Sequence, residues 1–270
     1  MLDLKITGGT VVDGTGAAPR RADVGVKDGR IVAVGEVVDD AESVIDATGL
    51  VVAPGFIDLH THYDAQAFWD PTLSPSPLHG VTTVMAGNCG FSIAPLTGVD
   101  GGEVRPDDAD YLMRMLARVE GMPLESLQQG VPWNWGTSEE YFDLLDGTLM
   151  PNAGFMVGHS ALRRVVMHDD ANRRAATADE IEQMKTLLRR GLAAGGMGFT
   201  STWSTSHNDH NGDVVPSRAA TREELIELCS VVSEFPGTQL EFIPAVGQLD
   251  RKSTRLNSSH IPLSRMPSSA

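Results

Sequence analysis

Two histidines separated by a single residue, His60 and His62, end an apolar run that begins at Val51. In an extended strand, side chains two residues apart project to the same face, so both imidazoles would point to one side where the strand stops. Neutral imidazole nitrogens are good ligands for zinc and similar divalent ions. The pair therefore predicts a two-imidazole metal clamp. A chance pair of surface histidines is the alternative, because the His-x-His spacing alone is a weak motif.

A cysteine follows a second apolar segment. Residues 81–86 are apolar and rich in β-branched side chains, which predicts a buried strand, and they lead into Gly87-Asn88-Cys89-Gly90. A thiol at the end of a strand is accessible from above, and the thiolate is the form that binds metal. Cys89 is thus a candidate third ligand. The alternative is a buried, inert thiol, the usual fate of a single cysteine.

Two carboxylates accompany the histidine pair. Asp58 lies two residues before His60, and Asp64 lies two residues after His62. Side chains beside a metal centre orient the ligating rings or hold the substrate. We predict a role of this kind for both aspartates.

Separated blocks of the chain, taken in order, resemble the amidohydrolase superfamily. The blocks are Lys5-Ile6-Thr7-Gly8-Gly9-Thr10-Val11-Val12-Asp13-Gly14, Asp28-Gly29-Arg30-Ile31, Asp46-Ala47-Thr48-Gly49 and the strand that ends in the two histidines. More narrowly, residues 87–95 resemble the N-acyl-D-amino-acid deacylase branch, and residues 158–163, Gly-His-Ser-Ala-Leu-Arg, are similar to a further block of that branch. The resemblance extends from residue 1 to about residue 249.

This resemblance implies a metal-dependent hydrolase of linear amides, with an N-acylated amino acid as substrate and one or two zinc ions as cofactor. It assigns His60, His62 and Cys89 to the metal centre, where a metal-bound water attacks the acyl carbonyl. Members of the branch add histidines from the fifth and sixth strands and a proton-shuttling aspartate from the eighth. On its fifth strand this chain has Glu241 instead, which we expect to serve as a ligand; a solvent-facing acid is the alternative.

Other polar residues lie at or after the later strands. His159 and Arg163 follow the third strand, and we expect them to contact the substrate or the metal ligands. For His159, the alternative is a histidine whose hydrogen bonds are satisfied within the protein and which has no functional role. The group His207, Asp209 and His210 suggests a second metal site, but its surrounding Asn, Asp and Gly residues favour a solvated loop. The stretch 98–136 is expected to be a lid or an exposed loop.

The pattern of strands and helices predicts an α/β protein with two domains. Residues 1–54 alternate short strands with Gly and Asp turns, which predicts the N-terminal part of a β-sandwich. Residues 55–249 alternate strands with helices that begin at Thr137, Thr177 and Thr221, as in βα units. We expect a catalytic TIM-like (β/α)8 barrel that is incomplete, because a whole barrel takes about 250 residues.

The C-terminal residues 250–270 have an unusual origin. They match, in one reading frame, the translation of two constant stretches of an adapter used in short-read DNA sequencing. The alternative is a natural Ser-rich disordered tail, which would have to match both adapter stretches by chance. We therefore expect a disordered, adapter-derived artefact on a C-terminally truncated chain. Such a chain is expected to bind metal but to have little or no turnover.

Composition limits the partners of the chain. A net charge of −15 argues against nucleic acid. The absence of a signal sequence and of roughly 18 consecutive apolar residues predicts a cytoplasmic protein without a membrane partner. With only Cys89 and Cys229, a disulfide framework is not expected.

The alternative to a linear-amide hydrolase is a cyclic-amide hydrolase, similar to hydantoinases or dihydropyrimidinases. Cys89 argues against this alternative, because those enzymes bridge two metals with a modified lysine.

Overall fold

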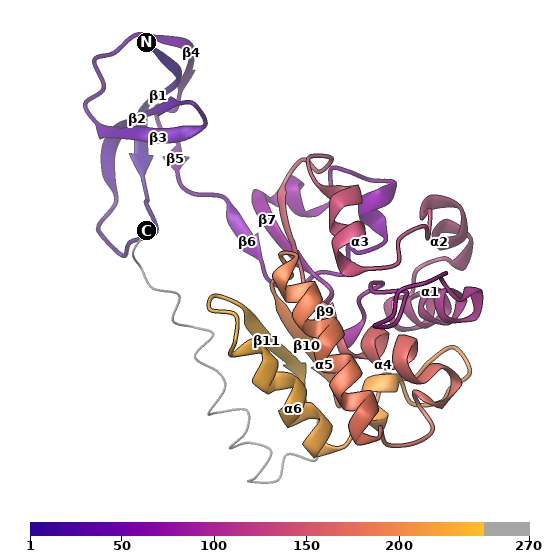
Figure 1. Ribbon diagram of the computed structural model, residues 1–270. Coiled ribbons are helices and arrows are strands. Elements are labelled where there is room, and N and C mark those ends of the chain that lie inside the picture. Colours follow the sequence, from indigo (N-terminus) through magenta and orange to yellow (C-terminus); the bar gives the residue numbers. More distant parts are fainter. Residues whose placement is uncertain (246–270) are drawn as a thin grey trace. The chain divides into compact units, whose positions relative to one another are not determined.

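A computed structural model describes residues 1–245 of the chain (Figure 1). These residues form two compact units, Met1–Phe56 and a larger unit that begins at Ile57. The predicted adapter-derived segment 250–270 lies outside the described residues. Within residues 1–245, no helix is both long and apolar enough to span a membrane.

The first unit is a five-stranded sheet. Its strands are β1 (Leu2–Val11), β2 (Arg20–Lys27), β3 (Arg30–Gly35), β4 (Ala41–Asp46) and β5 (Val51–Val52). The order is β3-β2-β1-β4, with β5 also paired to β1; β1–β2 and β2–β3 are antiparallel, whereas β4 and β5 run parallel to β1. Asp28 and Gly29 join β2 to β3 with φ of 50° and 70°, as a two-residue hairpin turn requires. The described residues of this unit contain one sheet, so the β-sandwich stays a prediction.

The larger unit carries its strands in sequence order. They are β6 (Phe56–Asp58), β7 (Val81–Ala86), β8 (Asn152–Phe155), β9 (Val157–Gly158), β10 (Gly198–Thr202) and β11 (Gln239–Ile243). The sheets have the orders β6-β7-β8 and β9-β10-β11, and only Met156 separates β8 from β9. The pairs β7–β8, β9–β10 and β10–β11 are parallel. A parallel arrangement places the strand ends, and the loops that follow them, at one edge.

Within the described part of the chain, six α-helices connect or flank these strands. They are α1 (Pro106–Glu120), α2 (Leu124–Gly130), α3 (Ser138–Leu145), α4 (His159–Met167), α5 (Ala178–Ala193) and α6 (Arg222–Val232). Helices α3 and α5 begin after Thr137 and Thr177 as predicted, and each of these residues forms a capping box. Thr221 also caps α6, but the side chain of Glu224 turns inward instead of completing the box. The stretch 98–136 contains α1 and α2, so the prediction that it is an exposed loop is wrong.

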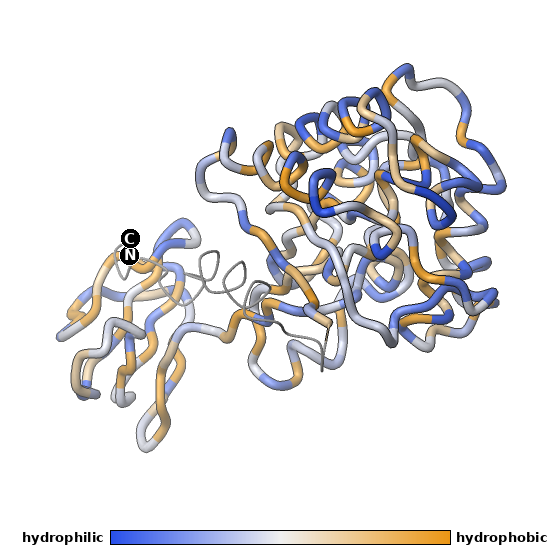
Figure 2. Tube along the Cα trace, turned by 90° about the horizontal axis from the view of Figure 1, so that it is seen from below, coloured by the Kyte–Doolittle hydropathy of each residue, from blue (hydrophilic) through white to orange (hydrophobic). Residues whose placement is uncertain are grey.

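Two apolar clusters hold the larger unit together. One joins β7 to helices α1–α3 around Trp135 and Tyr141. The other packs the apolar faces of α4, α5 and α6 against Val157 of β9 and Phe199 of β10. Figure 2 shows hydrophilic residues on the outer turns of this unit. The alternation of helices and parallel strands confirms the α/β class, while the number of strands in a complete barrel stays a prediction.

Candidate metal centre

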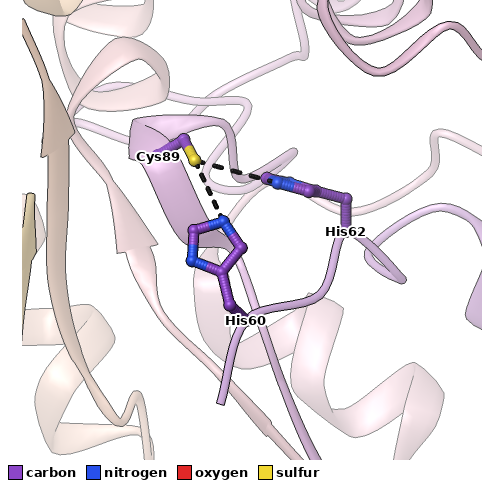
Figure 3. Close-up of side chains that lie close together, drawn as sticks. All are labelled: His60, His62 and Cys89. Carbon is purple, nitrogen blue, oxygen red and sulfur yellow. Dashed lines mark hydrogen bonds between the residues drawn. The ribbon is translucent and has the colours of Figure 1, made fainter. Parts of the chain in front are cut away.

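The three predicted ligands from the first two strands converge (Figure 3). His60 and His62 follow β6, and Cys89 lies in the short helical turn Asn88–Gly90 after β7. Cys89 Sγ is 3.3 Å from His60 Nε2 and 3.8 Å from His62 Nε2. All three ligand atoms lie within 4.8 Å of one another, and among residues 1–245 no other set of His, Cys, Asp and Glu side chains forms such a group.

These separations fit the geometry of zinc. Zinc binds sulfur at about 2.3 Å and imidazole nitrogen at about 2.0–2.1 Å, and tetrahedral angles then place S and N about 3.5 Å apart. The two S···N distances of 3.3 and 3.8 Å lie on either side of that value. The donor set and its spacing therefore form a possible metal site.

The charges around this group favour a cation. Asp64, Glu120 and Glu241 are largely buried, and burial raises the pKa of each carboxyl to about 7; the nearby charge of Asp64 also raises that of Glu120. Burying several acids together is costly unless a positive charge compensates them. A divalent ion among the two imidazoles and the thiol of Cys89 would supply that charge.

Glu241, the residue predicted as a ligand on the fifth strand, lies beside the group. Its Oε2 accepts a hydrogen bond from the backbone N–H of Cys89 at 2.8 Å, and its Oε1 is 3.9 Å from Nδ1 of His60. The side chain thus holds the cysteine backbone and is adjacent to one imidazole. Its role as a metal ligand stays a prediction.

The two aspartates beside the histidines differ in environment. Asp58 Oδ1 accepts the backbone N–H of His60 at 3.3 Å, which fixes the backbone at the first ligand. Asp64 is buried, and its Oδ2 accepts the backbone N–H of Gly87 at 2.9 Å. Gly87 has φ of 80°, and a Cβ there would lie 2.4 Å from the carbonyl oxygen of Met156, so this turn requires glycine. Both aspartates are therefore placed to orient the ligand-bearing backbone.

Glu120 was not recognised in the sequence. It is the last residue of α1, and its Oε2 is 3.4 Å from Nε2 of His62. No motif or spacing relates it to the histidine pair, because only the path of the chain through α1 brings it there. Its carboxylate adds negative charge next to a predicted ligand.

His159 and Arg163 lie in a fully buried network rather than beside the three ligands. Nδ1 of His159 is 2.9 Å from Oγ of Ser201, and its Nε2 is 2.9 Å from Oε1 of Glu224. Arg163 pairs with the other oxygen of Glu224 and donates to the carbonyl of Ala171 at 2.9 Å. A Ser–His–Glu set suggests a nucleophile, but Ser201, His159 and Glu224 are all 0% exposed. The network ties α4 to β10 and α6, and the substrate role of His159 and Arg163 stays a prediction.

The loop with His207, Asp209 and His210 forms no metal-binding group within residues 1–245. Asp209 is buried, and its Oδ1 accepts the backbone N–H groups of Asn211 and Asp213, while its Oδ2 accepts the hydroxyl of Tyr111. These bonds occupy both oxygens of Asp209. The loop is polar as predicted, but Asp209 is buried rather than solvated.

Protonation of the ligands leads to a pH prediction. Burial, followed by the charges of His60 and His207, lowers the pKa of His62 to about 4, so this imidazole is neutral near pH 7. Burial, followed by the charge of Glu241, holds the pKa of the Cys89 thiol well above its usual range. Metal binding must then displace the thiol proton. Between about pH 6 and about pH 8, we expect zinc affinity to rise by about tenfold per pH unit or more.

Competition with a chelator of known affinity, repeated across this pH range, measures that slope. The acids whose pKa is raised to about 7 add to the slope at its lower end. Cys229→Ser is the control and should keep the slope of the parent chain. A zinc affinity that does not change with pH would show that the thiol takes no part.

Comparison with known proteins places these residues in context. A model of the amidohydrolase family matches residues 43–256. The D-aminoacylase of Alcaligenes xylosoxydans xylosoxydans is 38% identical over 237 residues, which are 87% of this chain and 43% of that protein.

Solved structures give a similar picture. A D-aminoacylase structure concerned with a binuclear metal center is 37% identical with a TM-score of 0.68, covering 89% of this chain and 44% of that one. The N-acyl-D-glutamate deacylase of Bordetella bronchiseptica, complexed with zinc and a phosphonate mimic of the tetrahedral intermediate, is 36% identical with the same TM-score and the same coverage. The chain therefore spans less than half the length of these relatives.

Proposed function

The chain belongs to the amidohydrolase family, and we propose that it functions in the metal-dependent hydrolysis of N-acyl-D-amino acids. The convergence of His60, His62 and Cys89 at one point is the observation that carries this proposal. The likeness to D-aminoacylase and to N-acyl-D-glutamate deacylase supports the choice of a linear amide with a D-configured amino acid. The consecutive strands from β6 to β11 would then be part of a (β/α)8 barrel, and the first unit part of a β-sandwich.

The proposed metal is zinc, as one or two ions. His60 and His62 would hold it through Nε2 and Cys89 through Sγ, and Glu241 is a candidate further ligand. When bound, zinc lowers the pKa of a coordinated water to about 7 and polarises a substrate carbonyl. The chain's own contribution is to present two imidazoles and a thiol from fixed backbone positions. The lowered pKa of His62 keeps its ring neutral at neutral pH, so that one of its two nitrogens is free to bind the metal.

Cyclic-amide hydrolysis is the competing function. The position of Cys89 next to both histidines favours the linear-amide reaction, because the resemblance associates a cysteine at this position with the deacylase branch. Two relatives that match more than four-fifths of this chain, at 38% and 36% identity, are likewise named for D-amino-acid substrates: D-aminoacylase and N-acyl-D-aspartate deacylase.

An assay with the zinc-loaded chain in excess over substrate tests the proposal, because it detects hydrolysis even when turnover is slow. N-acetyl-D-glutamate, N-acetyl-D-methionine, their L enantiomers and dihydrouracil are compared, and Cys89→Ala serves as the control. We expect slow zinc-dependent cleavage of a D substrate that the control lacks, which an excess of the chain over substrate reveals even though the sequence predicts little or no turnover. Faster cleavage of dihydrouracil or of an L enantiomer, or no zinc-dependent cleavage, would contradict the proposal.

A further inference from the structure

The backbone that carries the Cys89 thiol has a conformation that a residue with a side chain rarely adopts. Cys89 has φ of 57° and ψ of 13°, between Gly87 with φ of 80° and Gly90 with φ of 79°. Glycine tolerates this left-handed region, whereas a residue with a Cβ is disfavoured there. Such a conformation persists when surrounding groups hold it in place. The position of the thiol therefore depends on what holds this turn.

A single hydroxyl closes the turn on both sides of Cys89. Thr200 lies on β10 and is 0% exposed. Its Oγ1 donates to the carbonyl oxygen of Gly87 at 2.7 Å and accepts the backbone N–H of Gly90 at 2.9 Å. Gly87, two residues before Cys89, and Gly90, directly after it, are thus fixed to the same residue of β10.

Two carboxylates complete the support of the turn. Asp64 accepts the N–H of Gly87 at 2.9 Å, and Glu241 accepts the N–H of Cys89 at 2.8 Å. Each carboxylate bonds one amide of the turn. Among the described residues, Thr200 is the side chain that both donates to this turn and accepts from it.

We propose that Thr200 is a positioning residue that holds the Cys89 thiol between His60 and His62 and so preorganises the metal centre. The inference rests on the proposed metal-dependent function. Its physical basis is that a ligand already in place loses less conformational freedom when the metal binds. Without the hydroxyl, the carbonyl of Gly87 and the N–H of Gly90 lose a buried partner, and the turn relaxes towards a conformation that suits the Cβ of Cys89 better.

Two substitutions separate the hydroxyl from the shape of the side chain. Thr200→Val keeps the branched shape and removes the hydrogen bonds, whereas Thr200→Ser keeps the hydroxyl. Thr202→Val is the matched control, because Thr202 is also buried on β10 but its hydroxyl bonds to His207 and to the N–H of Ser204. Zinc affinity is measured by chelator competition, and the thiolate-to-metal charge-transfer absorption is measured with cobalt.

We expect Thr200→Val to weaken zinc binding by about 10- to 100-fold, the usual effect of losing a partner that orients a metal ligand. Its cobalt complex should show a weaker charge-transfer band, while Thr200→Ser and Thr202→Val stay close to the parent chain. Unchanged affinity and spectrum in a folded Thr200→Val would overturn the inference. An equal loss in Thr200→Ser would also overturn it, because the hydroxyl would then not be the determinant.

Hydrogen exchange in the unsubstituted chain tests the inference without any variant. The Gly90 amide should exchange slowly although it lies in a turn, because it donates to a buried hydroxyl. Rapid exchange at Gly90 would overturn the inference even if Thr200→Val fails to fold. Failure of the parent chain to bind zinc would instead overturn the proposed function. Hydrogen exchange at Gly90 would then still decide whether Thr200 anchors the turn.

Discussion

Replacing Cys89 by alanine is expected to weaken zinc binding by more than about 100-fold, because removing a direct ligand exceeds the 10- to 100-fold cost of losing an outer partner. The two imidazoles that remain supply nitrogen donors but no anionic sulfur. The affinity of the variant should also lose the pH dependence that arises from displacing the thiol proton. Chelator competition at several pH values measures both effects.

The second cysteine of the chain provides the control. Cys229 lies on α6, is partly buried, and belongs to the apolar cluster of α4–α6 rather than to the metal centre. Cys229→Ala should bind zinc like the parent chain. Equal zinc affinities of Cys89→Ala and the parent chain would show that Cys89 is not a metal ligand.

Replacing Glu224 by alanine is expected to lower the free energy of unfolding by about 3–5 kcal/mol, the usual cost of breaking a buried ion pair by removing one partner. Burial alone would raise the pKa of Glu224, but the hydrogen bonds and charges of His159 and Arg163 lower it. Without this carboxylate, the Arg163 guanidinium is left as an uncompensated charge at 0% exposure. Urea unfolding of the two proteins measures the difference.

The neighbouring residue on the same helix gives a matched control. Glu223 is exposed, and Glu223→Ala should change the unfolding free energy by less than about 0.5 kcal/mol. Glu224→Gln keeps the shape of the side chain but not its charge. Its loss of unfolding free energy should lie between those of Glu224→Ala and Glu223→Ala. A Glu224→Ala variant as stable as Glu223→Ala would show that the buried network contributes nothing to stability.

Local signals explain what the sequence predicts well. The sequence places His60 and His62 near each other, and their rings lie 5.3 Å apart. The predicted strand itself is too long, because β6 ends at Asp58 and both histidines lie in the segment that follows it. The capping boxes at Thr137 and Thr177 are also local, since donor and acceptor lie three residues apart. The pairing of Cys89 with the two histidines could be anticipated because both groups follow successive strands, and β6 and β7 are indeed neighbours in one sheet.

Contacts between distant segments explain what the sequence does not predict. Thr200 bonds to a residue 110 positions away, and Glu241 to one 152 positions away, so their spacing in the sequence carries no signal. Glu224 has the sequence context of a capping residue, yet its carboxylate is used by His159 and Arg163. Periodicity identifies the buried face of a helix, but the partners on that face depend on how the helices pack.

X-ray absorption of the zinc-loaded chain tests the central claim most directly, because it reports the atoms bound to the metal. We predict a sulfur neighbour of zinc at about 2.3 Å together with nitrogen or oxygen ligands at about 2.0–2.1 Å, and loss of the sulfur in Cys89→Ala. A shell of nitrogen and oxygen alone in the parent chain would contradict a centre built from His60, His62 and Cys89.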